Sequence, residues 1–169
     1  MSEWRTRAEQ PGDELAIGEI ARAAFPGDAE AGLVEALRAD PAAWIDGLST
    51  VAVAADGSLV GHALLTRCHV GGSPALALAP CAVLPECQRR GAGSAAIRGA
   101  LNAARGRGEN LVVVLGHAEY YPRFGFTPAA EHGISAPVPV SEEAFMVLSL
   151  DPEREAPAGT VEYPGAFGI

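Results

Sequence analysis

The sequence contains no lysine, so all twelve of its basic residues are arginines. Twenty-one acidic residues outnumber them and give a net charge of −9. This charge disfavours general binding to nucleic acid, because a negative surface repels phosphate backbones, and it favours cationic or neutral ligands. No apolar run approaches the ~18 residues of a membrane-spanning helix, so we expect no membrane association.

Cysteine is also scarce. Cys68, Cys81 and Cys87 are odd in number and lack metal-ligand spacing with the four histidines. We therefore predict reduced thiols, with neither a disulfide framework nor a metal site. The N-terminal sequence M-S-E-W-R-T-R lacks the apolar core of a signal peptide, which predicts a cytoplasmic protein.

What the chain does contain is enough apolar sequence for one ordinary domain. It has 169 residues, 49% of them hydrophobic, and no internal repeat. We place the domain at residues 1–150. Residues 151–169 are rich in proline, glycine and acids, and we expect them to form a C-terminal tail that packs on the same domain.

The first third of the chain predicts a strand, two helices and a hairpin. The expected elements are a strand at 4–8, helices at 13–25 and 29–38, and two antiparallel strands around the turn Asp56-Gly57. In the first helix, Leu15, Ile20 and Ala24 are expected on the inner side.

Residues 76–101 organise the rest of the chain, as a strand, a glycine-containing turn and a helix. The apolar run L-V-V-V-L at 111–115 then predicts a strand covered on both faces, parallel to the first. A last strand is expected at 144–150. The fold class is therefore α/β with a mixed sheet.

The turn Q-R-R-G-A-G at 88–93 opens a helix, where free backbone N–H groups suit a bound phosphate. Five arginines lie between Cys87 and Gly108, and no acid occurs there; they are Arg89, Arg90, Arg98, Arg105 and Arg107. A basic island in an acidic protein favours an anionic ligand at the turn. The alternative is a solvated basic face of the helix.

These residues resemble a known family. Q-R-R-G-A-G matches the Q/R-x-x-G-x-G/A signature of the GCN5-related N-acetyltransferases (GNAT superfamily), and Y-Y-P-R-F-G-F at 120–126 matches their second landmark. The resemblance covers roughly residues 4–150. It is strongest to the small N-acetyltransferases of that superfamily that have no assigned substrate.

The resemblance implies a GNAT-like acyl-CoA N-acyltransferase fold: about six to seven strands with a splayed parallel pair, flanked by about four helices. It implies an acetyltransferase that uses acetyl-CoA as cosubstrate and needs no metal. The acetyl group would pass to a primary amine of a small molecule or peptide, by direct attack through a tetrahedral intermediate. Members of the family often dimerise, so a homodimer is one outcome the resemblance allows.

The resemblance also implies which residues bind the cofactor. Backbone N–H groups would cradle the pyrophosphate at Arg89, Arg90, Gly91, Ala92, Gly93 and Ser94, and the arginines could meet the 3′-phosphate. Pro80 cannot complete a strand ladder, which predicts a bulge or splay there. The freed backbone of Cys81, Ala82 and Val83 would then bond the pantetheine arm, with a main-chain N–H available to the oxyanion.

Tyr121 occupies the position of the family's tyrosine, which implies that it donates a proton or hydrogen bond to the departing thiolate; packing in the core is the alternative. The general base stays open. Some relatives carry a glutamate at the position of Ala77, and here only His62 and His117 offer suitable side chains nearby. Deprotonation by water, or binding of an already neutral amine, is favoured over both. An acyl intermediate on Cys81 is disfavoured, because no histidine is near it in sequence.

Two other functions compete with this interpretation. G-A-G-S-A-A fits a dinucleotide-binding fingerprint, but it follows the strand too late and the next strand ends in L-G-H, without an acid. A catalytically inactive acyl-CoA sensor or structural module is favoured by the missing base and disfavoured by Tyr121.

Overall fold

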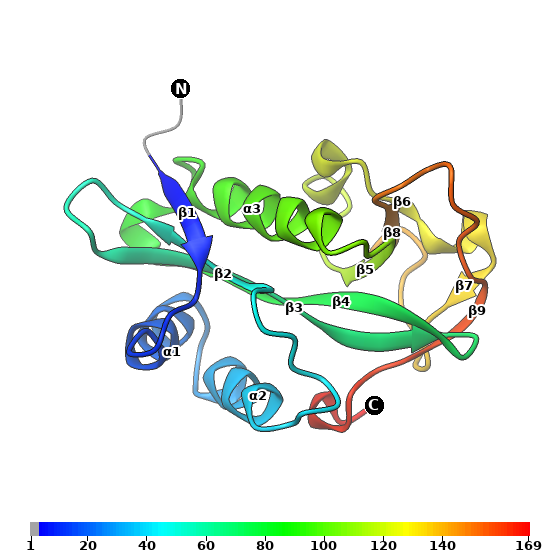
Figure 1. Cartoon of the computed structure of the whole chain (residues 1–169), viewed down its shortest axis with the longest axis horizontal. Helices are drawn as coiled ribbons and strands as arrows, with labels where there is room; N and C mark the ends of the chain where they lie inside the picture. The colour runs from blue at the N-terminus through cyan, green and yellow to red at the C-terminus, as the bar shows by residue number, and fades with distance from the viewer. Residues whose placement is uncertain (1–3) are drawn as a thin grey trace.

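The computed structural model describes residues 4–169 and shows one large mixed sheet with helices on both faces (Figure 1). Along the main path of the sheet the strand order is β1-β2-β3-β4-β5-β8-β6. The strands are β1 (Arg5–Ala8), β2 (Ser49–Val53), β3 (Leu59–Val70), β4 (Ser73–Val83), β5 (Leu111–Leu115), β6 (Thr127–Pro128), β7 (Ile134–Ser135), β8 (Phe145–Ser149) and β9 (Gly159–Glu162). The expected mixed α/β sheet is confirmed, with nine strands because the short β6, β7 and β9 add to it.

Strands β3 and β4 form the longest hairpin. They are joined by Gly71 and Gly72, whose φ angles of 55° and 82° lie in the left-handed region that glycine adopts without strain. Strand β4 therefore begins at Ser73, earlier than the apolar run alone predicts. Most of β3 is buried on both faces, because helices cover both sides of the sheet at its centre.

Helices α1 (Glu14–Ala24) and α2 (Ala29–Arg38) cover one face, and α3 (Ala92–Gly106) covers the other (Figure 1). Both helical segments predicted before residue 40 are confirmed. The inner face of α1 is centred on Ile17 and Ile20, which are each 1% exposed, whereas Leu15 is 72% exposed. The inward placement of Leu15 was therefore wrong: in the first turn of α1 its side chain lies away from the sheet.

The parallel pair of β4 and β5 is splayed, as Pro80 predicts. The two strands are paired only at Leu76 with Val112 and at Ala77 with Val113. Beyond that point β4 stays with β3 and β5 stays with β8. In the ladder of β3 and β4 the register shifts at Pro80, so that one residue of β3 faces two residues of β4, which is a bulge.

The segment after residue 150 returns to the sheet. Strand β9 runs antiparallel to the end of β3, where Val161 pairs with Val70 and is fully buried. A short 3₁₀ helix, η4 (Gly165–Phe167), then lies against α2 (Figure 1). Within residues 4–169, no helix is both long and apolar enough to span a membrane.

Candidate functional site

The start of α3 is an open helix end. Arg89 and Gly91 have φ angles of 64° and 89°, so the turn before the helix contains two left-handed residues. Gly91 is the N-cap residue and has no side chain with which to cap the first turn. The first N–H groups of α3 therefore point out of the helix without an intrahelical acceptor, in the positive field of the helix dipole.

A cavity of about 480 Å³, here called the turn cavity, lies over this helix end. Its lining residues are Val83, Gln88, Arg89, Gly91, Gly93, Ser94, Tyr120 and Arg123. A Cβ atom on Gly93 would lie 3.0 Å from Cγ2 of Val83, so a larger residue would press on the Val83 side chain at this close approach of helix and strand. Across the cavity, the hydroxyls of Ser94 and Tyr120 are hydrogen-bonded at 3.1 Å.

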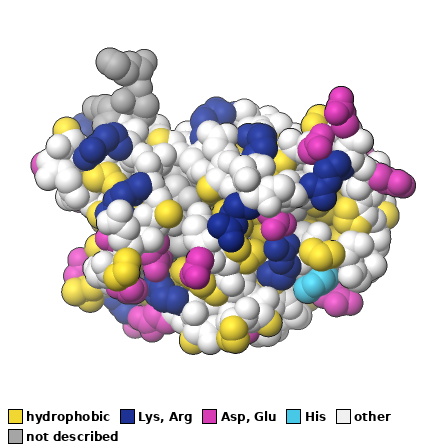
Figure 2. Space-filling model, viewed as in Figure 1, with side chains coloured by type: hydrophobic (Ala, Val, Ile, Leu, Met, Phe, Trp, Pro, Cys, Tyr) yellow, Lys and Arg dark blue, Asp and Glu magenta, His cyan; other side chains and the backbone are white. Residues whose placement is uncertain are grey.

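The basic island does not form one patch. Of its five arginines, only Arg89 lines the turn cavity. Arg98 stacks on the ring of Phe124 at 4.9 Å, and Arg105 donates to Oδ1 of Asn102 at 2.9 Å. Figure 2 accordingly shows basic side chains at several separate places on this face. The second arginine of the turn cavity is Arg123, which comes from the Y-Y-P-R-F-G-F landmark rather than from the helix.

Arg123 and Tyr120 are coupled to each other. The Arg123 guanidinium donates from Nε to the Tyr120 carbonyl oxygen at 2.8 Å and lies over the Tyr120 ring at 4.3 Å. This stacking fixes a positive charge beside the helix end. Sequence reasoning assigned neither residue to the site, although both lie within the landmark that it used.

A second cavity, of about 460 Å³, occupies the gap between the diverging strands and is here called the splay cavity. Both splayed strands contribute to its wall, together with the α1–α2 region and the C-terminal segment. Its lining residues are Phe25, Glu30, Leu33, Ala77, Leu78, Ala79, Pro80, Cys81, Val113, Val114, Leu115, Gly116, His117, Tyr121, Tyr163, Phe167 and Ile169.

Tyr121 and Cys81 meet at this cavity. Both residues line the cavity, and each contributes to the pKa shift of the other. Desolvation raises the pKa of Tyr121 well above its ordinary value, and the neighbouring thiol raises it further. Desolvation also raises the pKa of Cys81 to about 12, although the tyrosine hydroxyl opposes this shift. At neutral pH both groups therefore keep their protons and are donors, not bases.

The tyrosine ring is held firmly. A Cβ atom at Gly116 would overlap the Tyr121 ring, so glycine at the end of β5 lets the ring lie flat against the backbone. Edge-on contacts with the rings of Tyr120 and Phe126, at centroid distances of 5.2 and 5.9 Å, support it from other sides. Tyr121 therefore packs against its neighbours, which was its alternative role, and its hydroxyl also reaches the splay cavity.

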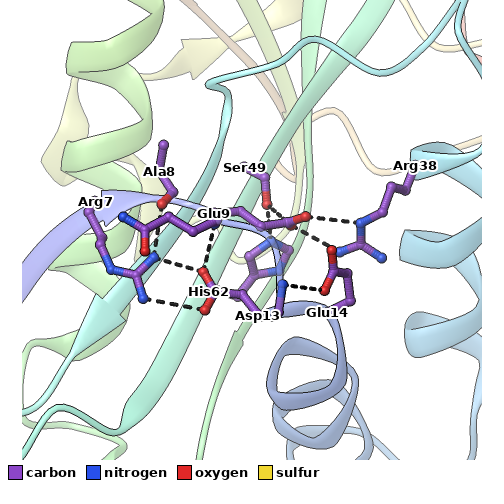
Figure 3. Close-up of polar contacts among 10 residues, drawn as sticks. Arg7, Ala8, Glu9, Asp13, Glu14, Arg38, Ser49 and His62 are labelled. Atoms are coloured by element: carbon purple, nitrogen blue, oxygen red, sulfur yellow. Dashed lines mark hydrogen bonds and ion pairs between the residues drawn. The ribbon is translucent and has the colours of Figure 1, made fainter.

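His62 lies outside both cavities. It is 2% exposed, and its Nε2 is hydrogen-bonded to the Ser49 hydroxyl at 2.8 Å (Figure 3). The same hydroxyl donates to Glu9, which is ion-paired with Arg38. Burial, and secondly the charge of Arg38, lower the pKa of His62 to about 3. His62 is therefore a neutral structural histidine, and the structure does not place it where a general base would act.

The splay cavity has two other groups of interest. His117, a candidate base, is exposed and is one of the lining residues. Glu30, in the first turn of α2, lines the same cavity as Ala77. Glu30 was not predicted from the sequence, because an acid was expected only in the segment that carries Ala77.

The predicted site residues are thus divided. Cys81 and Tyr121 line the splay cavity, whereas Val83, Arg89, Gly91, Gly93 and Ser94 line the turn cavity. Ala82 and Ala92 are buried, and Arg90 is exposed outside both walls with its carbonyl oxygen accepting from Trp4 at 2.8 Å. The two alanines could therefore contribute to cofactor binding only through their main-chain groups. Among residues 4–169, no three His, Cys, Asp or Glu side chains are arranged to hold a metal ion.

The arrangement agrees with comparisons to known proteins. A family model for the acetyltransferase (GNAT) family matches residues 15–126. The chain is 43% identical over 146 residues to the uncharacterized N-acetyltransferase YjhQ of Escherichia coli strain K12, and the alignment covers 82% of this chain and 80% of YjhQ.

Solved structures show the same fold. YhbS from Escherichia coli, a GNAT family N-acetyltransferase crystallised in complex with CoA, has a TM-score of 0.91 at 30% identity and is matched over 100% of this chain and 94% of its own. A GNAT family acetyltransferase from Brucella melitensis in complex with acetyl-CoA has a TM-score of 0.78 at 32% identity, with 99% of each chain covered. The expected GNAT-like fold is confirmed, and the chain belongs to the GNAT acetyltransferase family.

Proposed function

We propose that the protein transfers an acetyl group from acetyl-CoA to a primary amine by direct attack. The observation that carries the proposal is the joint presence, at the end of β4, of an uncapped helix start and a splayed strand edge that leads to Tyr121. These features accommodate the two ends of one long ligand. The relatives in complex with CoA and acetyl-CoA support the choice of ligand.

The polar end of acetyl-CoA fits the turn cavity. The pyrophosphate would accept from the backbone N–H groups of Arg89 to Ser94, where the helix dipole contributes ~0.5 positive charge. Arg89 and Arg123 supply full positive charges on the same wall. A Cβ at Gly93 would already press on Val83, so the wall has no spare room at that point.

The pantetheine arm fits the splayed edge of β4. Beyond Ala77 this edge has no partner in β5, so main-chain groups of Cys81, Ala82 and Val83 can bond an amide-bearing chain as a neighbouring strand would. Acetyl-CoA supplies the thioester, which the arm would bring toward Cys81 and Tyr121. A main-chain N–H of β4 would there stabilise the negative charge that develops on the carbonyl oxygen.

Tyr121 would act on the leaving group. Because its raised pKa keeps the hydroxyl protonated, it can donate a hydrogen bond to the departing thiolate, which is a weaker base than the tyrosine phenolate. The thiol of Cys81, with a pKa of about 12, is a poor nucleophile at neutral pH, since the thiolate is the reactive form. This supports direct attack by the amine over an acyl-cysteine intermediate.

Thermal unfolding followed by a thiol-release assay tests the proposal. Acetyl-CoA at 100 times its Kd should stabilise the protein by ~2.7 kcal/mol and raise the Tm, whereas NAD should not. An amine panel should then produce free CoA thiol. A Tm shift with NAD but none with millimolar acetyl-CoA would refute the proposal. A shift with acetyl-CoA but no turnover on any amine would instead support an acyl-CoA-binding module without catalysis.

A further inference from the structure

The splay cavity differs in character from the acidic surface of the protein. Rings from distant segments contribute to its wall: Phe25 between α1 and α2, and Tyr163 and Phe167 near the C-terminus. The rings of Tyr163 and Phe167 are 5.2 Å apart and lie against each other. Aliphatic side chains such as Leu33 and Leu78 continue the wall, so most of it is apolar.

Few polar side chains reach this cavity. Among the described residues that line it, Glu30 is the one with a carboxylate side chain, and none is an arginine. The remaining polar side chains are the Tyr121 and Tyr163 hydroxyls, the Cys81 thiol and His117. One carboxylate side chain on a mainly apolar wall suits a ligand with one positive charge and an apolar body.

We propose that the acceptor is a small primary monoamine with an aryl or branched alkyl body, whose ammonium group is recognised by Glu30. This inference rests on the proposed acetyltransferase function and specifies its substrate class. The volume of about 460 Å³ lies within the range of small-molecule sites, ~300–1,000 Å³. The aromatic rings of the lining hold the body of the amine, and the C-terminal segment contributes two of these rings, Tyr163 and Phe167.

Polycationic acceptors fit this wall poorly. The net charge of −9 alone favours a polyamine, an aminoglycoside or a basic peptide. Each of these would bring further ammonium or hydroxyl groups into a cavity where Glu30 is the one carboxylate side chain among the described lining residues. Burying such groups without partners is unfavourable, so the local wall outweighs the overall charge.

Direct comparison of acceptors tests the inference. Acetyl-CoA binding is first established by calorimetry, so that failure of the proposed function is recognised separately. With acetyl-CoA saturating, 2-phenylethylamine and isoamylamine should each show at least a tenfold higher kcat/KM than spermidine or an aminoglycoside. Equal or better turnover of the polycations would overturn the inference and leave the acetyltransferase proposal intact. The inference would also be overturned if neither 2-phenylethylamine nor isoamylamine bound to the CoA-bound protein.

Two variants test the assigned contacts. Glu30→Gln should weaken binding of 2-phenylethylamine to the CoA-bound protein about tenfold and leave binding of its neutral isostere 2-phenylethanol unchanged. Glu35→Gln, on the exposed side of α2, is the matched control and should change neither. Equal binding of the amine to wild type and Glu30→Gln, or equal loss for amine and alcohol, would contradict the role of Glu30.

Phe167→Ala supplies an independent check if Glu30→Gln proves unstable. Phe167 is half-buried near the C-terminus, so its truncation should leave the sheet intact. The KM for 2-phenylethylamine should rise about fivefold while the KM for acetyl-CoA stays constant. An unchanged KM for the amine would contradict the placement of the apolar body under this segment.

Discussion

The turn cavity and the splay cavity both reach the C-terminal end of β4, one through Val83 and the other through Cys81, but they are built differently. Most of the turn cavity comes from the continuous segment 88–94, and its wall carries two arginines and several hydroxyl and backbone groups. The splay cavity is assembled from segments between Phe25 and Ile169, and its wall is mainly apolar. The first is suited to a charged group common to many acyl donors, and the second to a particular acceptor.

The division of chemistry follows from these walls. A helix start and a glycine turn bind phosphate through the backbone, which depends little on side-chain identity. A cavity lined by side chains from remote segments changes whenever any of these segments changes. The proposed donor is therefore bound by local backbone geometry, and the proposed acceptor by tertiary packing.

The largest expected effect is on the turn cavity alone. Gly93→Val should weaken acetyl-CoA binding about 100-fold, because a branched side chain beside Val83 forces α3 and β4 apart. In packed protein cores, overpacking of this kind costs ~1–3 kcal/mol. Calorimetry measures the Kd, and circular dichroism checks the fold.

Gly106→Val is the matched control for this substitution. Gly106 ends the same helix, and a Cβ atom there meets nothing within 4 Å. Its Kd for acetyl-CoA should stay within about twofold of wild type, since exposed substitutions change free energies by ~0.5 kcal/mol or less. Equal loss of affinity in both variants would mean that general damage to α3, not the turn cavity, explains the effect.

The second prediction separates the two cavities by their tyrosines. Tyr121→Phe should lower kcat about 10- to 100-fold and leave the Kd for acetyl-CoA nearly unchanged, because the lost hydroxyl acts on the leaving group. Tyr120→Phe removes the hydrogen bond to Ser94 and should instead raise the KM for acetyl-CoA up to about fivefold, with kcat preserved. Steady-state kinetics with a reactive amine measures both. An unchanged kcat in Tyr121→Phe would remove the catalytic role of this tyrosine.

The same contrast explains what could be predicted from the sequence. The strands, the helices and the splay at Pro80 follow from local patterns, because turn residues and apolar periodicity act within a few positions. The basic island is only partly brought to one site: Arg89 lines the turn cavity, whereas Arg98 contacts Phe124, because successive residues along a helix turn by about 100°.

The residues that line the splay cavity could not be predicted from such local patterns. Glu30 and Phe167 have no local signature, because their role depends on α2 and the C-terminal segment meeting beside β4. Arg123 could have been assigned earlier, since it stands inside the second landmark. The pair of Tyr121 and Cys81 is intermediate: each was proposed from the sequence, but their contact follows only from the bulge at Pro80.

The last expected effect concerns His62, which belongs to neither cavity, and it appears in stability rather than in turnover. The folded state holds His62 neutral with a pKa of about 3, whereas the ordinary value is 6.5, so below pH ~6 the unfolded state binds more protons. The free energy of unfolding should therefore fall as the pH falls from about 6 toward 4, by up to ~1.4 kcal/mol per pH unit from this group.

Urea unfolding of wild type and His62→Gln at pH 7, 6 and 5 measures the slope, which should be smaller in the variant. The pH dependence of kcat should be the same in both proteins, because His62 lines neither cavity. A variant that keeps the wild-type stability slope but loses a limb of the kcat profile would return His62 to the role of general base.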